Sequence, residues 1–402
     1  MAAENDPARA HVRGVYLERR VRGLLCTVLT VASCTRGGMP ANSSTALPDR
    51  WFLDTVPIVL AIARDSGSAI PFGGAVGAVR TKSGMFLVAD LLSRSIVLLD
   101  SNGAPQKTVE REPDSLNRPA EVRSLRRCPG SGLSLAHDIS RRRLILLNDL
   151  GDIVQVLNLP RRLTFAQVID CGSGGATAWM KFPLASYPMV GDTMSDAHLV
   201  RIVPTRLESR ADTLRTFGTT EYFMSRQGSF IEQPFGREAF AASDGREAYL
   251  GSSHSRIVEA FDVAGGTVRK MSVDLRPSPL SVGDLLEATL LRLNDEPTED
   301  SRARVRQVYA QAPLKVSKPF YNDLVLDRGG NLWLRTLELG ASDSVRWHVV
   351  SNRGATEALI NMPAFLKIFE IGDDYVLGVE RRASRPERVV LYRLDKSRTI
   401  LR

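Results

Sequence analysis

The chain has 402 residues, of which 43% are hydrophobic and 24% are charged, a composition that excludes an intrinsically disordered protein. The formal net charge is +8, and residues 1–33 contribute five arginines and three acids to it. The remaining excess is spread thinly over the rest of the chain. This is not the charge pattern of a nucleic-acid-binding protein.

The N-terminal stretch has the pattern of a secretory signal. Three arginines between positions 19 and 22 precede an apolar run over residues 24–32, which is too short to span a bilayer. The run ends in Val31-Ala-Ser-Cys34, which resembles a bacterial lipobox at every position. Residues 1–33 are therefore predicted to be a lipoprotein signal peptide, and Cys34 is predicted to carry the lipid. The alternatives are a simple signal peptide with an incidental cysteine and a buried helix.

Residues 34–50 are rich in Gly, Ser, Pro, Ala and Asn, and this composition predicts a flexible tether. Thr35 follows the predicted lipid-bearing cysteine where an inner-membrane retention signal has Asp. We therefore expect a bacterial cell-envelope protein, lipid-anchored to the outer membrane on its periplasmic or surface face. The folded part, residues 51–402, is expected to be a monomer.

From Trp51 onward, short apolar strands alternate with turns rich in Gly, Asp, Asn and Ser. Six units of roughly 40 residues, each with several strands, favour an all-β six-bladed β-propeller over two unrelated β-sandwiches. Turn glycines align among the best copies. The first turn glycine of the unit is at positions 84, 245 and 330, and a later turn glycine is at positions 103, 265 and 354. Residues 187–190, 198–203 and 219–225 form a weaker third unit.

Two segments lie outside these units. Residues 57–62 are predicted to close the ring by pairing beside residues 389–394 in the last blade. Residues 278–313 are predicted to be a two-helix insertion between blades four and five, with one helix over 284–293 and a second after Thr298. The second has an apolar stripe at helical spacing and an acidic first turn. The stripe consists of Val305, Val308, Tyr309 and Ala312.

Two motifs in the last third carry a resemblance to a known family. Asp327-Arg-Gly-Gly-Asn-Leu-Trp-Leu-Arg335, and Ile371-Gly-Asp-Asp-Tyr-Val-Leu-Gly-Val379 followed by Val390-Leu-Tyr-Arg-Leu394, resemble strands of secreted six-bladed β-propeller lipoproteins, which are related to the NHL and TolB-like propellers. The resemblance covers residues 51–402. It implies a fold and an envelope location, and it brings no catalytic motif. The Gly-rich loop usual after the first blade is replaced here by residues 110–117.

The sequence shows no convincing catalytic or metal-binding motif, so no cofactor is expected. None of the five histidines lies in HExxH or at metal-ligand spacing from another ligand. Asp90, His137 and Asp138 end strands, where a propeller can line its channel, and we keep them as channel-lining candidates. The alternative is a role in turns. Ser253 and His254 are adjacent, but a nucleophile and its base are recognised by spatial geometry and not by sequence order.

Two cysteines remain after the signal and the lipid site, Cys128 and Cys171. Export makes a disulfide between them possible, and two separate buried thiols are the alternative.

Three functional readings are open. The first is a non-catalytic binding or scaffold propeller at the envelope, with an unknown protein or glycan partner that docks on the face carrying residues 281–312. The second is a propeller hydrolase or lyase with its site in the central channel. The third is an accessory subunit of an envelope complex.

Overall fold

The computed structural model divides into two units, and the second, Leu47–Arg402, contains the fold. It describes residues 49–54, 56–62, 73–109, 121–172, 175–180, 194–205, 209–224, 230–276, 279–281, 283–284, 286, 289, 293, 298–313, 315, 317–337, 343–382 and 385–396. Cys34 and the predicted signal and tether before residue 49 lie outside the described residues.

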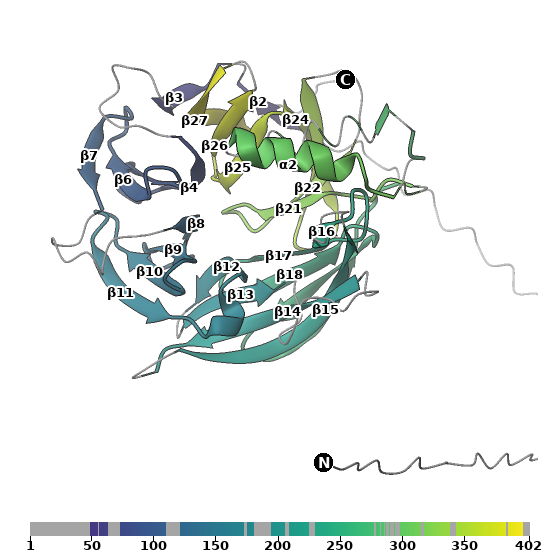
Figure 1. Ribbon diagram of the computed structural model, residues 1–402, viewed down its shortest axis with the longest axis horizontal. Coiled ribbons are helices and arrows are strands. Elements are labelled where there is room, and N and C mark those ends of the chain that lie inside the picture. Colours follow the sequence, from purple (N-terminus) through teal and green to yellow (C-terminus); the bar gives the residue numbers. More distant parts are fainter. Residues whose placement is uncertain are drawn as a thin grey trace, which may run out of the picture. The chain divides into compact units, whose positions relative to one another are not determined.

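Six antiparallel sheets surround a central axis, which confirms the predicted six-bladed β-propeller (Figure 1). Blade one has β4 (Ala75–Arg80), β5 (Phe86–Asp90), β6 (Ser95–Leu99) and β7 (Pro105–Thr108), and blade two has β8 (Val122–Arg127), β9 (Ser134–Asp138), β10 (Arg143–Leu147) and β11 (Ile153–Asn158). Blade three has β12 (Gln167–Gly172), β13 (Gly175–Met180), β14 (Met194–Val203), β15 (Arg210–Met224) and β16 (Phe230–Glu232).

Blade four has β17 (Ala239–Ser243), β18 (Glu247–Ser252), β19 (Ile257–Asp262) and β20 (Val268–Ser272). Blade five has β21 (Asp323–Leu326), β22 (Leu332–Thr336), β23 (Ser344–Val350) and β24 (Thr356–Pro363), and blade six has β25 (Leu366–Ile371), β26 (Tyr375–Arg382) and β27 (Arg385–Asp395). The N-terminal strands β1 (Asp49–Arg50), β2 (Phe52–Leu53) and β3 (Ile58–Ile62) join blades five and six.

The turn after each innermost strand explains the aligned glycines. Gly84, Gly245 and Gly330 all adopt a positive φ of 81–88°, which glycine reaches without steric cost. In the outer turn of blade four the left-handed residue is Gly266 and not the predicted Gly265.

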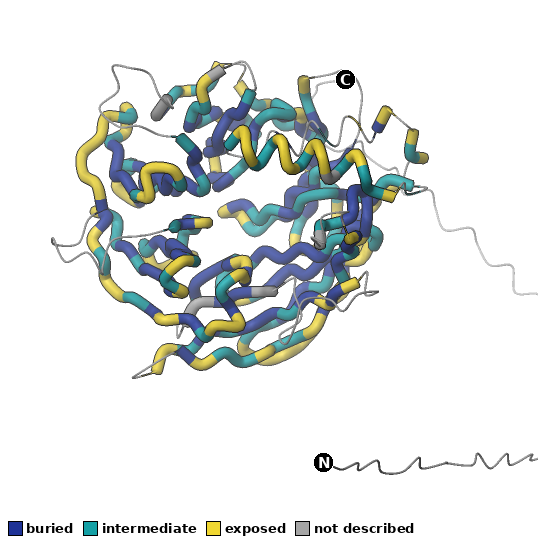
Figure 2. The backbone as a smooth tube through the Cα atoms, viewed as in Figure 1, coloured by how far each residue is buried: buried dark blue, intermediate teal, exposed yellow. Residues whose placement is uncertain are grey.

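The hydrophobic core is divided into six clusters, each between two neighbouring blades. Trp333 and Trp347 are fully buried in the cluster between blades five and six, as expected for core residues. Figure 2 shows the burial in the inner and middle strands, while the outer strand β7 is exposed along its length. Each blade is thus held by both of its neighbours, and the ring has to close.

The N-terminal strand closes the ring as predicted. β3 pairs antiparallel with β27 in blade six, with Val59 opposite Val390 and Ile58 opposite Leu391. A buried polar link supports this closure. Arg381 donates to Glu387 at 2.8 Å, and Glu387 accepts the backbone N–H of Ala75 in blade one at 2.6 Å.

Between blades four and five the structure describes one helix, α2 (Glu299–Tyr309), where two were predicted. Thr298 caps it, since its Oγ1 accepts the N–H of Ser301 at 3.1 Å. The helix predicted over 284–293 falls mostly outside the described residues. Within the described part of the chain, no helix is long and apolar enough to cross a membrane.

A disulfide joins Cys128, directly after β8, to Cys171 in β12, with their Cα atoms 5.0 Å apart. It therefore links blade two to blade three.

Candidate functional site

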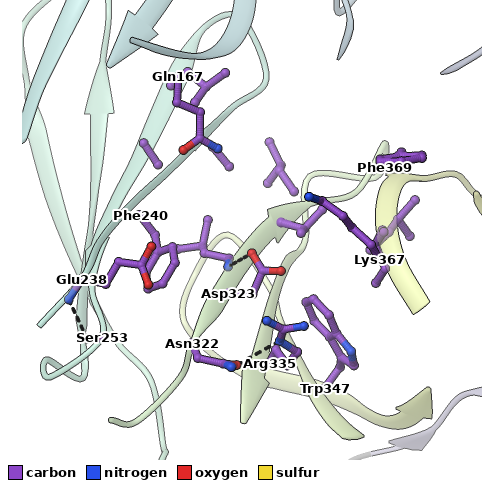
Figure 3. A pocket seen from close by; sticks show the side chains of 18 of the residues that line it. Gln167, Glu238, Phe240, Ser253, Asn322, Asp323, Arg335, Trp347, Lys367 and Phe369 are labelled. Carbon is purple, nitrogen blue, oxygen red and sulfur yellow. Dashed lines mark hydrogen bonds between the residues drawn. The ribbon is translucent and has the colours of Figure 1, made fainter. Parts of the chain in front are cut away.

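A cavity of about 610 Å³ lies where the innermost strands of blades two to six meet. Its walls are made by β8, β12, β17, β21 and β25, together with residues 232–236 before β17 and Tyr309 of α2. Figure 3 shows side chains from several blades around this space. The volume lies within the usual range of small-molecule sites.

The end of the cavity where the innermost strands begin, here called the entry end, is polar. Gln167, Asp323 and Lys367 stand at the first or second positions of their strands, and Glu238 directly precedes β17. In Figure 3, Asp323 and Lys367 extend into the cavity from neighbouring blades.

Aromatic side chains and one arginine stand beside these polar groups. Phe240 and Phe369 line the cavity from blades four and six. Arg335 donates to Asn322 Oδ1 at 3.0 Å and lies 5.9 Å from the centre of the Trp347 ring, so its guanidinium is held in place. The entry end therefore offers both flat apolar surfaces and hydrogen-bonding groups.

Two segments cover the entry end. Residues 233–236 line the cavity, and the buried Phe235 has a φ of 56°, a strained conformation for a bulky residue. Gln233 Nε2 donates to the carbonyl of Pro313 after α2 at 2.6 Å, and Lys315 lies 3.2 Å from Glu221 in β15. These contacts tie the insertion to blade three. Tyr309, from the predicted apolar stripe, adds to the cavity wall.

The opposite end, where the innermost strands finish, is organised by the buried carboxylate of Glu370. Its Oε1 accepts Nε and Nη2 of Arg328 at 2.8 and 2.5 Å, and its Oε2 accepts the N–H of Arg80 at 2.8 Å. Arg127 Nε lies 3.1 Å from Oε1 without hydrogen-bond geometry. Burial is the largest single effect and lowers the pKa of Arg328, but the charge and hydrogen bond of Glu370, together with Tyr375 and Asp373, outweigh it and the net direction is upward. Glu370 therefore connects blades one, two, five and six.

Arg126 is a further cation in the cavity wall. It extends from β8 to blade six, where Nη1 donates to the carbonyl of Phe369 at 3.4 Å. Burial lowers the pKa of Arg126, and the negative charge of Asp323 opposes that effect.

The three channel-lining candidates from the sequence are all buried, and the cavity wall contains none of them. Asp90 accepts the N–H groups of Gly74 at 2.7 Å and Ser93 at 2.8 Å. Asp138 accepts the N–H of Glu121 at 3.2 Å and Nε of Arg143 at 3.1 Å. Both carboxylates therefore fasten the start of an innermost strand to the turn after the second strand.

His137 is buried beside Asp138, and burial lowers its pKa to about 4. Its Nε2 has no hydrogen-bond partner among the described residues. Asp90, His137 and Asp138 lie in the second strands of their blades, outside the cavity wall, and the two aspartates have the turn role that was the alternative.

Ser253 occupies the same place in blade four as Asp90 and Asp138 in theirs. Its Oγ accepts the N–H of Glu238 at 2.9 Å and lies 3.2 Å from the carbonyl of Gly236 and 3.1 Å from Nδ1 of His254. The hydroxyl thus serves the backbone turn. Across the residues that the structure describes, no group of three or more His, Cys, Asp and Glu is placed to hold a metal ion.

Sequence reasoning missed the charged residues of the cavity. Lys367 and Glu370 stand in β25, whose other residues are apolar, and Arg126 and Arg127 end β8, which also contains Arg123 and Ser124. Charges within an innermost strand were the available signal, because such a strand has one side toward the core and the other toward the axis.

Neither family models nor curated proteins match this chain. Similar solved structures include a member of the DUF4221 family from Bacteroides vulgatus, with 11% identity, a TM-score of 0.43, and coverage of 87% of this chain and 99% of that one. A virginiamycin B lyase from Staphylococcus aureus has 11% identity, a TM-score of 0.38, and coverage of 80% and 95%. A gluconolactonase from Xanthomonas campestris has 12% identity, a TM-score of 0.39, and coverage of 90% and 98%. At these identities the likeness concerns the fold alone.

Proposed function

We propose that this chain is a binding protein that holds a small molecule in the central cavity of its propeller. The observation that carries the proposal is the cavity itself, about 610 Å³ in volume and lined by charged, amide and aromatic side chains from five blades. A core built for packing alone would fill this space with apolar side chains. Charged groups such as Lys367 and Asp323 are half-buried on this wall, where a polar ligand would contact them.

The covered entry end supports the same reading. Phe235 is held in a strained backbone conformation in the loop over the cavity, and strain of this kind clusters at ligand-binding sites. The loop is tied to the insertion through Gln233 and Pro313, so both segments belong to one cover.

Envelope anchoring is a second part of the proposal. Val31-Ala-Ser-Cys34, after the short apolar run, supports lipid attachment at Cys34. The tether over residues 35–48 would then hold the propeller away from the membrane surface while its cavity binds ligand.

Native mass spectrometry of the full-length chain purified from its source cells tests the binding role. The wild type is expected to carry a non-covalent small molecule. Gln167→Trp, at an exposed position on the cavity wall, should fill the space and abolish the adduct. Gln155→Trp, on the exposed outer strand β11, is the matched control and should retain it.

Absence of any small molecule from the wild type, in extracts and after incubation with a metabolite library, would refute the proposal. Equal ligand occupancy in the wild type and Gln167→Trp would refute the cavity as its site.

A further inference from the structure

The arginines at the Glu370 end of the cavity outnumber the carboxylates that pair with them. We infer that this end binds the anionic group of the ligand, a carboxylate or a phosphate, through Arg126 with Arg127 and Arg328. The inference rests on the proposed binding function and specifies the class of ligand.

The charge balance is the first step. Among the described residues, Glu370 is the one carboxylate within ion-pair distance of Arg127 or Arg328, and no carboxylate lies within that distance of Arg126. Three guanidinium groups on the cavity wall therefore share a single direct ion-pair partner. The other carboxylates at this end, Asp244 and Asp327, bind backbone N–H groups, Trp333 and Lys396. Each guanidinium has five N–H donors, so most of their donors have no acceptor among the described residues.

The role of Glu370 is the second step. Its two oxygens are already used by the side chain of Arg328 and the backbone of Arg80, which lock blades five and one to blade six. Ring closure thus explains the hydrogen bonds that Arg328 donates to Glu370. Arg127 forms an ion pair with Glu370, and its Nε makes no hydrogen bond there.

Arg126 is not needed for the lock, and this is the third step. Among the described residues, Arg126 makes one long hydrogen bond, to the Phe369 carbonyl at 3.4 Å. Arg126 is half-buried on the cavity wall, so part of its guanidinium faces the cavity space and not the protein. Burial lowers the pKa of Arg126, and the negative charge of Asp323, which lies beyond ion-pair distance, opposes that effect. A ligand anion at Arg126 would supply the missing partner.

The other end of the cavity limits the ligand further. Glu238 and Asp323 stand at the entry end, where a second anionic group would be repelled. Phe240 and Phe369 provide flat surfaces between the two ends. The ligand class is therefore a small molecule with one anionic end and a neutral or cationic remainder. Arginine suits this role because its fork matches carboxylate and phosphate oxygens.

Thermal denaturation of the full-length chain in mild detergent, at constant ionic strength, tests the inference. The probes are inorganic phosphate and acetate, with chloride as the reference. The wild type should be stabilised by phosphate or acetate in a saturable manner, with the rise in Tm reporting Kd. Arg126→Gln should weaken the binding by about tenfold or more, because a charge-assisted contact is lost. Arg126→Lys keeps the charge and loses the forked donor geometry, so its Kd should lie between those of the wild type and Arg126→Gln.

Arg123→Gln is the matched control, since Arg123 is in the same strand but exposed and paired with Glu121 at 2.7 Å. It should respond to the probes as the wild type does. Equal responses of Arg126→Gln and the wild type, or no anion response in the wild type, would overturn the inference. If the cavity adduct found by mass spectrometry is neutral and survives in Arg126→Gln, the anion site is refuted while the binding function stands.

Discussion

Asp170 provides a direct test of how a buried carboxyl group near the propeller axis affects the stability of the fold. It lies in β12 with no exposed surface, where Oδ1 accepts the N–H of Cys171 at 2.5 Å and Oδ2 accepts the hydroxyl of Ser243 in blade four at 2.9 Å. Burial, with a smaller contribution from the neighbouring charge of Asp244, raises its pKa from 3.8 to about 6 despite these hydrogen bonds. The folded protein therefore holds a proton on Asp170 more tightly than the unfolded chain does.

The sign of the pH dependence follows from this difference. The stabilisation from Asp170 is fully present below the unfolded pKa of 3.8 and is lost as the pH rises through about 6. A shift of about two units corresponds to roughly 3 kcal/mol of unfolding free energy. Asp170→Asn carries no titrating proton and keeps the shape of the group. The unfolding free energy of Asp170→Asn minus that of the wild type should therefore rise by about 3 kcal/mol as the pH goes from about 4 to about 8.

Urea denaturation of both proteins across this pH range gives the difference directly. Asp244→Asn is an informative companion, because removing its charge lowers the pKa of Asp170 and moves the loss of stability to lower pH. A difference between Asp170→Asn and the wild type that stays constant from about pH 4 to pH 8 would show that Asp170 does not titrate as argued.

Two further predictions concern the two ends of the folded unit. Cys34→Ser should lose the incorporation of radiolabelled palmitate that the wild type shows in growing cells, and equal labelling would contradict lipidation at Cys34. Deleting residues 51–62 should expose the edge of β27 in blade six, lower the Tm and promote aggregation, as measured by melting curves and size-exclusion chromatography. A monomer with an unchanged Tm would mean that β3 does not stabilise the ring.

Much of the fold was predictable because the turn residues and the apolar strands recur in the same order in successive blades. Gly84 and Gly330 mark the first turn of their blades since a left-handed residue is required there. Trp333 and Trp347 lie in strands whose alternation directs them into the core between blades. The closing strand β3 was predictable because it stood outside the six units, and a propeller ring closes when the N-terminal strand joins the last blade.

Other elements left no signal in the sequence. β7 consists of four exposed residues, Pro105–Thr108, and no apolar alternation marks it as a strand. β1 pairs parallel with β24 over two residues, Asp49 and Arg50, so its position depends on the fold that it joins. No apolar alternation marks either strand, so the sequence alone does not predict them.

The cavity could not be assembled from sequence because its groups meet only in the closed ring. Arg126 and its acceptor Phe369 are 243 residues apart in the chain. Glu370 contacts groups from blades one, two and five, and no short motif contains these residues. The charge of each group was visible, but its partners depended on how the first and last blades are joined.

The aspartates that were predicted to line the channel show which distinction was missing. An acid at the end of a strand is what a catalytic channel needs, and it is equally what a turn needs to bind backbone N–H groups. For these aspartates, position relative to the first turn glycine separates the two roles. Asp90 and Asp138 follow Gly84 and Gly132, so they end second strands and fasten turns. The cavity residues Arg126, Asp323 and Lys367 precede the first turn of their blades, so they stand on innermost strands. In a propeller, a charged residue before the first turn is therefore the stronger indication of a ligand site, whatever its residue type.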